Sequence, residues 1–67
     1  MPRFRIDDMT CQHCVGAITR AVKAADAAAQ VQVDLANHEV VVEGGALSGA
    51  ALKAVIEDAG YTPESVG

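Results

Sequence analysis

The spacing of apolar residues changes repeatedly along the chain, and these changes constrain the fold more than any other feature. Apolar and polar residues alternate over residues 3–7, which is typical of a half-buried strand. From Cys14 to about Asp26 the apolar residues recur at steps of three and four, which predicts an amphipathic helix. Alternation returns at 31–35 and at 40–42, on either side of a short polar connection, and predicts a β-hairpin.

The last third of the chain predicts a second helix and a short strand. Ser48 can cap this helix at its start, and Gly60 ends it. Residues 61–66 allow only a short edge strand, where Pro63 is tolerated because an edge position need not donate every ladder hydrogen bond. With right-handed crossovers, the order βαββαβ predicts a ferredoxin-like α+β sandwich, an antiparallel four-stranded sheet with both helices on one face.

We expect residues 1–67 to form a single domain, because a chain of this length can bury only one small core. Such a core leaves no room for a large enzyme cleft. The predicted core collects the inward apolar residues of each element: Phe4, Ile6, Met9, Ile18, Val22, Val33, Leu35, Val40, Val42, Leu52 and Ile56.

The charge balance and the apolar pattern exclude two classes of partner. The chain has nine acidic and five scattered basic residues, a net charge of −4, whereas nucleic-acid binding needs clustered Lys and Arg. It has no unbroken apolar stretch that would act as a secretory signal or insert into a membrane. We therefore expect a cytoplasmic, reducing location, where paired cysteines tend to be metal-binding or redox-active.

Cys11 and Cys14 are the only cysteines, and two residues separate them where the first strand gives way to the helix. Two thiolates so placed can hold one soft metal ion and leave it open to a partner, and the helix start should lower the pKa of Cys14. Soft sulfur favours Cu(I), while two protein ligands leave zinc short of the four it prefers. The pair alone also fits a dithiol redox site, although the chain lacks tryptophan and is short for a thioredoxin-like fold.

Four other residues could contribute to a site around the pair. Met9 is expected to pack in the core rather than to bind metal through its thioether. His13, between the cysteines, is expected to be a free surface imidazole. His38 is expected to be an ordinary turn residue at the opposite end of the sheet from the cysteines. Tyr61 either shields the metal or covers the edge of the core.

The segment Met9-Thr10-Cys11-Gln12-His13-Cys14 resembles the MxCxxC signature of the heavy-metal-associated domain. This is the family of cytosolic copper chaperones and of the N-terminal domains of copper-transporting P-type ATPases. The similarity extends over nearly the whole chain and includes Val31 to Leu35, Val40 to Gly44 and Glu57 to Tyr61.

The resemblance implies roles for five residues. Cys11 and Cys14 would be the metal ligands, and Met9 would be a core residue beneath the metal loop. Tyr61 would sit beside the site, as in bacterial copper chaperones. Thr10 stands where zinc-exporting relatives often have an aspartate, which favours copper.

The resemblance also implies a function, that of a Cu(I)-binding metallochaperone which is not an enzyme. It would deliver copper to a copper-transporting P-type ATPase by thiolate exchange through a three-coordinate intermediate. One alternative is an excised N-terminal domain of such an ATPase, although Met1 and the prompt end after Tyr61 favour a free-standing protein. Another is a dithiol oxidoreductase. We expect a monomer without metal, and a homodimer bridged by copper is an open alternative. Zinc, mercury and silver are also open alternatives as the metal that is carried.

Overall fold

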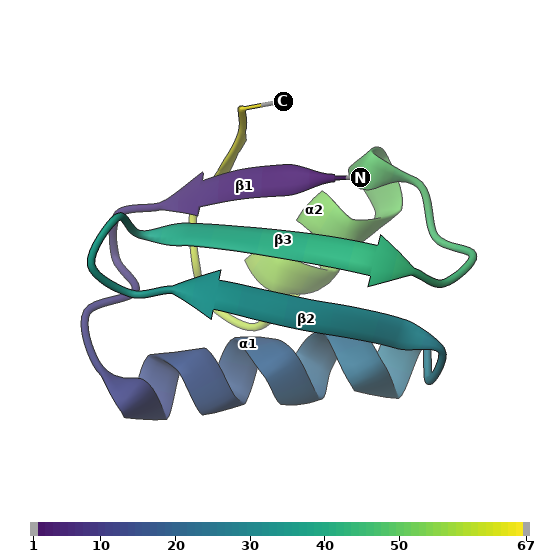
Figure 1. The fold of residues 1–67 in the computed structure, drawn as a ribbon, viewed down its shortest axis with the longest axis horizontal. Coiled ribbons are helices and arrows are strands. Elements are labelled where there is room, and N and C mark those ends of the chain that lie inside the picture. The colour runs from purple at the N-terminus through teal and green to yellow at the C-terminus, as the bar shows by residue number, and fades with distance from the viewer. Residues whose placement is uncertain (1, 67) are drawn as a thin grey trace.

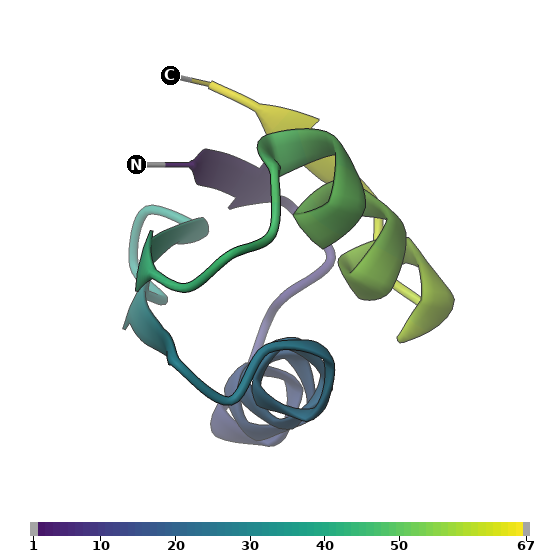
Figure 2. The ribbon, with the colours of Figure 1, turned by 90° about the vertical axis from the view of Figure 1, so that its right-hand side faces the viewer.

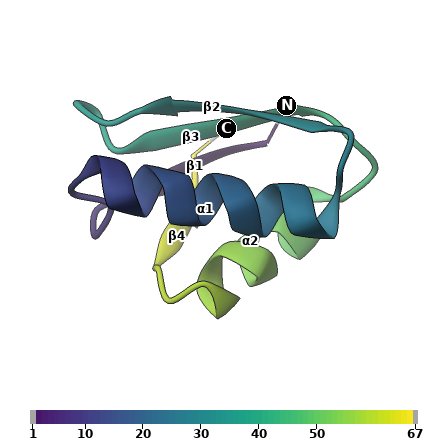
Figure 3. The same cartoon turned by 90° about the horizontal axis from the view of Figure 1, so that it is seen from below.

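The computed structural model describes residues 2–66, which form two helices and four strands (Figure 1). The strands join in one sheet in the order β2-β3-β1-β4, and every neighbouring pair is antiparallel. Both helices lie on the same face of this sheet, as the end-on and lower views show (Figures 2 and 3). The predicted ferredoxin-like βαββαβ sandwich is therefore confirmed. In chain order, the elements are β1 (Arg3–Ile6), α1 (Gln12–Ala25), β2 (Ala29–Asp34), β3 (Glu39–Gly44), α2 (Gly49–Asp58) and β4 (Pro63–Ser65).

The hairpin of β2 and β3 has the register that its apolar pattern predicts. Val31 lies opposite Val42, and Val33 lies opposite Val40, so the valines of the two strands share one face. On the other side of β3, the central strand β1 places Arg5 opposite Glu39. Because β1 and β3 run antiparallel, the start of β3 lies beside the end of β1. The β2–β3 turn and the β1–α1 loop therefore meet at the same end of the sheet.

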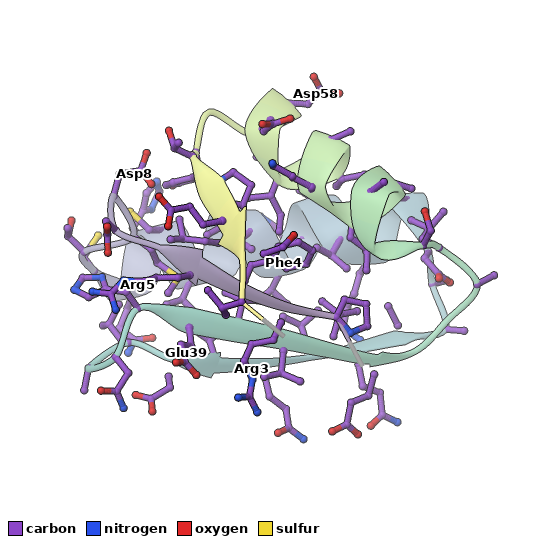
Figure 4. The ribbon with its side chains drawn as sticks, turned by 90° about the horizontal axis from the view of Figure 1, so that it is seen from above. Arg3, Phe4, Arg5, Asp8, Glu39 and Asp58 are labelled. Carbon is purple, nitrogen blue, oxygen red and sulfur yellow. The ribbon has the colours of Figure 1, made fainter. Side chains whose placement is uncertain are left out.

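The core fills the space between the sheet and the helices. Phe4 lies in this space, whereas Arg3 and Glu39 lie on the outer side of the sheet (Figure 4). The prediction was wrong for Val33 and Leu35, which are only half-buried because β2 is an edge strand that ends at Asp34. The buried apolar residues are Phe4, Ile6, Met9, Ile18, Val22, Ala29, Val40, Val42, Leu52 and Ile56.

The helix ends follow from local hydrogen bonding. α1 begins at Gln12, earlier than predicted, because the extended backbone of Cys11 caps it and the Cys11 carbonyl accepts the Val15 amide at 3.2 Å. The Ser48 hydroxyl accepts the Ala51 amide at 3.2 Å and caps α2, as predicted. Within residues 2–66, neither helix has the length and apolar character needed to cross a bilayer.

Asp26, which follows α1, holds the loop between β3 and α2 in place. Its carboxylate accepts the amides of Ala46 at 2.6 Å and Leu47 at 3.3 Å, and that of Ala28 at 3.2 Å. These amides, that of Ala46 above all, hold the pKa of Asp26 below its ordinary value. The predicted helix boundary near Asp26 is confirmed, since α1 ends at Ala25.

Candidate metal centre

The two cysteine side chains lie together at the start of α1. Cys11 is exposed and is the last residue of the β1–α1 loop, which comprises residues 7–11. Cys14 is half-buried in the first turn of the helix. Both are free thiols, and their Sγ atoms are 3.6 Å apart. Sulfur atoms gather at the end of the molecule where Asp8 lies (Figure 4). The sequence prediction that the two sulfurs meet at the surface is confirmed.

The separation of the sulfurs suits a shared metal ion. With metal–sulfur bonds of about 2.3 Å, a distance of 3.6 Å between the sulfurs corresponds to a sulfur–metal–sulfur angle of about 100°. A linear arrangement needs sulfurs about 4.6 Å apart. Because Cys11 is exposed, rotation of its side chain can supply the additional ~1 Å without moving the helix. The pair can therefore close on one ion over a range of angles.

The surroundings of Cys14 favour its thiolate. Its pKa is lowered from 9.0 to about 7, first by the Tyr61 hydroxyl, which donates to the sulfur, then by the backbone amide of Thr10 and by Cys11. The same contact raises the pKa of Tyr61, which is consistent with a hydroxyl held as a donor beside a thiolate. The lowered pKa was predicted, but its main cause lies in the loop after α2 rather than at the helix start.

Met9 and His13, which the sequence singled out around the pair, lie as expected. The Met9 side chain is fully buried, and its amide donates to the Ile6 carbonyl at 3.1 Å. Thr10 and His13 are exposed, and Tyr61 is half-buried against the core. Within residues 2–66, no group of three or more His, Cys, Asp or Glu side chains is arranged to hold a metal ion.

The prediction for His38 was wrong, because this residue lies beside the β1–α1 loop rather than at the far end of the sheet. The Ile6 amide donates to the His38 carbonyl at 2.8 Å, and the His38 Nδ1 atom is 2.9 Å from the Met9 carbonyl oxygen. The antiparallel pairing of β1 and β3 brings the turn to this end. That pairing follows from the predicted fold, so the position of His38 could have been found from the sequence.

Asp8 ties the same loop to the segment that follows α2. Its Oδ1 atom accepts the Thr62 amide at 3.3 Å, next to Tyr61 in the chain. Sequence reasoning did not find this contact, since the two residues are 54 positions apart. The β1–α1 loop is thus held from the hairpin on one side and from the loop after α2 on the other.

The model of the family described as "Heavy-metal-associated domain" matches residues 3–62. The chain belongs to this family. The match includes both cysteines, both helices and the three longer strands. No curated protein sequence matched the chain.

Solved structures of similar proteins share this fold over almost the whole chain. One, a gold-binding protein, is 35% identical, with a TM-score of 0.93, and the alignment covers 98% of this chain and 100% of that one. A point mutant of the copper chaperone Atx1 from Synechocystis PCC6803 is 37% identical, with a TM-score of 0.88 and coverage of 92% and 97%. The N-terminal domain of PacS from the same organism is 26% identical, with a TM-score of 0.78 and coverage of 98% and 96%.

Proposed function

We propose that this protein is a metallochaperone that holds one Cu(I) ion between Cys11 and Cys14 and delivers it to a copper-transporting P-type ATPase. The observation that carries the proposal is the surface pair of free thiols, 3.6 Å apart, one of which has a pKa of about 7. Near neutral pH such a pair offers thiolate to a metal at little cost, because protons compete weakly for the sulfur. The ion stays accessible because Cys11 is exposed.

The donor set supports Cu(I) as the cargo. Thiolates are soft ligands that select Cu(I), whereas structural zinc sites use four ligands. Thr10 beside Cys11 supplies no carboxylate that would favour a harder ion. Similarity to a copper chaperone and to a gold-binding protein points the same way, since both metals are soft in the monovalent state. Zinc, mercury and silver are the competing cargoes.

Transfer would proceed by ligand exchange. An incoming thiolate bonds to Cu(I) and gives a three-coordinate intermediate, after which the bond to Cys11 or Cys14 breaks and that sulfur is free to take up a proton. The copper stays Cu(I) throughout, so no oxidant or reductant is consumed. Exposed Cys11 lies on the side that an incoming ligand reaches first. No covalent substrate chemistry is involved, and in this proposal the protein is not an enzyme.

The partner would be the cysteine-pair domain or the copper entry site of the ATPase. Similarity to the PacS N-terminal domain over 98% of this chain is consistent with a donor and an acceptor that share one fold. We further propose that residues 1–67 act as a single cytoplasmic heavy-metal-associated domain, monomeric without metal. The same similarity fits the alternative, an N-terminal domain within an ATPase, which transmembrane segments downstream in the same reading frame would establish.

Serine substitutions at each cysteine test the proposal. Cys11→Ser and Cys14→Ser should each lose tight Cu(I) binding in an anaerobic competition against a Cu(I) chelator, because serine provides a hard oxygen in place of a soft thiolate. His13→Asn is the matched control, since it removes a potential donor between the cysteines and should keep wild-type affinity. Near-native affinity in both cysteine variants would end the proposal.

The lowered pKa of Cys14 also favours a second candidate function, a dithiol oxidoreductase. Reactive pairs of this kind attack disulfides through a thiolate whose pKa lies near ambient pH. The reduction of insulin disulfides and the reduction potential of the pair separate the two functions. The carrier proposal predicts no turnover in the insulin assay.

A further inference from the structure

His38 has an unusual backbone conformation for its residue type. Among residues 2–66 it is the only residue other than glycine with a positive φ, at 55°. The left-handed region costs free energy for residues with a Cβ atom and persists where the surrounding structure enforces it. His38 ends the turn that precedes β3, where glycine would adopt this conformation freely. The presence of histidine rather than glycine at this position therefore needs a physical explanation.

That explanation lies in two hydrogen bonds to the β1–α1 loop. The His38 carbonyl accepts the Ile6 amide at 2.8 Å, and His38 Nδ1 lies 2.9 Å from the Met9 carbonyl oxygen. A carbonyl can only accept, so Nδ1 carries the proton and donates it. The imidazole thus crosses from the hairpin to a residue 29 positions earlier in the chain.

The peptide that His38 binds lies directly before the metal site, because Cys11 follows Thr10 in the chain. The carbonyl of Met9 and the amide of Thr10 belong to a single planar unit, in which they point in opposite directions. His38 binds the carbonyl, and the Thr10 amide on the other side of the same unit is one of the groups that lower the pKa of Cys14. The Met9 side chain is fully buried, so the core fixes one side of this residue and His38 fixes the other.

We propose that His38 is a positioning residue for the cysteine pair, which fixes the Met9–Thr10 peptide and so places Cys11, the next residue, relative to Cys14. The inference rests on the proposed function, because its effect is measured on a bound Cu(I). The His38 Nδ1–H group donates to the Met9 carbonyl, and the same peptide unit carries the Thr10 amide, next to Cys11 in the chain. Because the peptide unit is planar, loss of this hydrogen bond leaves the whole unit free to rotate, and with it the backbone that precedes Cys11.

The test compares His38→Gly with Asn37→Ala, a control in the same turn. Glycine keeps the left-handed conformation and removes only the imidazole, so the turn should survive. Asn37→Ala breaks the Asn37 Nδ2 bond to Asp34 Oδ2, 2.8 Å, without touching Met9. We expect His38→Gly to weaken Cu(I) affinity about threefold to tenfold, the effect of one net hydrogen bond. Asn37→Ala should lower the unfolding temperature and leave the affinity unchanged.

Nuclear magnetic resonance of the metal-free proteins supplies readouts that general destabilisation would not produce. Wild-type His38 should show the tautomer protonated at Nδ1. His38→Gly should move the Thr10 amide resonance and speed its hydrogen exchange, while Asn37→Ala should leave both as in wild type.

Three results would overturn this inference alone, provided that wild type binds Cu(I) tightly. The first is an unchanged affinity in His38→Gly, the second is a wild-type His38 protonated at Nε2, and the third is an equal loss of affinity in His38→Gly and Asn37→Ala. Failure of wild type to bind Cu(I) would overturn the proposed function instead.

Discussion

Removal of the Tyr61 hydroxyl should raise the pKa of Cys14. Four hydrogen bonds lower this pKa from 9.0 to about 7, and that of Tyr61 is the largest, so Tyr61→Phe should raise it by at least about 0.5. At pH 7, the thiolate fraction of Cys14 would then fall from about one half to about one quarter or less. Phenylalanine keeps the half-buried ring against the core, so the fold should be unchanged.

The assay is a pH titration of the Cys14 Cβ resonance in the metal-free, reduced protein, which separates this thiol from Cys11. The rate of alkylation by iodoacetamide at Cys14, followed by mass spectrometry, should fall in parallel at pH 7. Apparent Cu(I) affinity should weaken as pH falls through the pKa of Cys14, and in Tyr61→Phe this weakening should begin at higher pH. Conversely, Cys14→Ala should lower the raised pKa of Tyr61. An unchanged Cys14 pKa in a folded Tyr61→Phe variant would refute the reasoning.

Substitutions at three further positions test the packing and the loop contacts by chemical denaturation. Met9→Ala should lower the free energy of unfolding by about 2–5 kcal/mol, because this side chain is fully buried, whereas Met9→Leu should cost less than about 1.5 kcal/mol. Gly16→Ala should raise the free energy of unfolding by about 0.5–1 kcal/mol, because alanine has the higher helix propensity. The new Cβ would meet only the flexible end of Arg20, at 3.2 Å. A lower free energy of unfolding would show that Arg20 cannot move. Asp26→Asn should destabilise the protein near neutral pH. The pKa of Asp26 is lowered in the folded state. Its ionised carboxylate therefore stabilises the fold above the unfolded-state pKa of about 3.9, and this stabilisation disappears as pH falls through the folded-state pKa. The variant should therefore lose less stability on acidification below about pH 4 than wild type, and an equal acid loss in both would contradict this assignment.

The sequence predicted those parts of the fold that depend on local pattern. Alternation placed Val31, Val33, Val40 and Val42 on one face, and the structure pairs them across the hairpin. Ser48 was predicted as a cap because a hydroxyl at the start of an apolar period satisfies a free amide. Such features are encoded within a few neighbouring residues, which is why a single sequence suffices to find them.

The features that the sequence analysis did not find depend on contacts between distant segments or on residues without a distinctive side chain. Ala29 is buried because β2 begins under α1, yet an alanine carries no periodic signal. Asp26 was predicted only as a helix boundary, because its bonds to the loop before α2 depend on how that loop returns. The contact of Asp8 with Thr62 likewise requires the tertiary fold.

Some features of the candidate site could likewise be predicted from the sequence, and others needed the structure. The spacing of Cys11 and Cys14 was sufficient to predict that the sulfurs meet, since both lie within one turn of the start of α1. The role of Tyr61 as the main cause of the lowered Cys14 pKa needed the structure. The position of His38 needed only the antiparallel pairing of β1 and β3, which the predicted topology already contained.

Direct transfer of copper is the measurement that tests the central claim most directly. The Cu(I)-loaded protein is mixed anaerobically with a metal-free heavy-metal-associated domain that carries its own cysteine pair, in the presence of a chelator that traps free Cu(I). If the ion passes by thiolate exchange, copper should appear on the acceptor at a rate that rises with acceptor concentration and is unaffected by the trap. Capture of the copper by the trap before it reaches the acceptor would contradict the account.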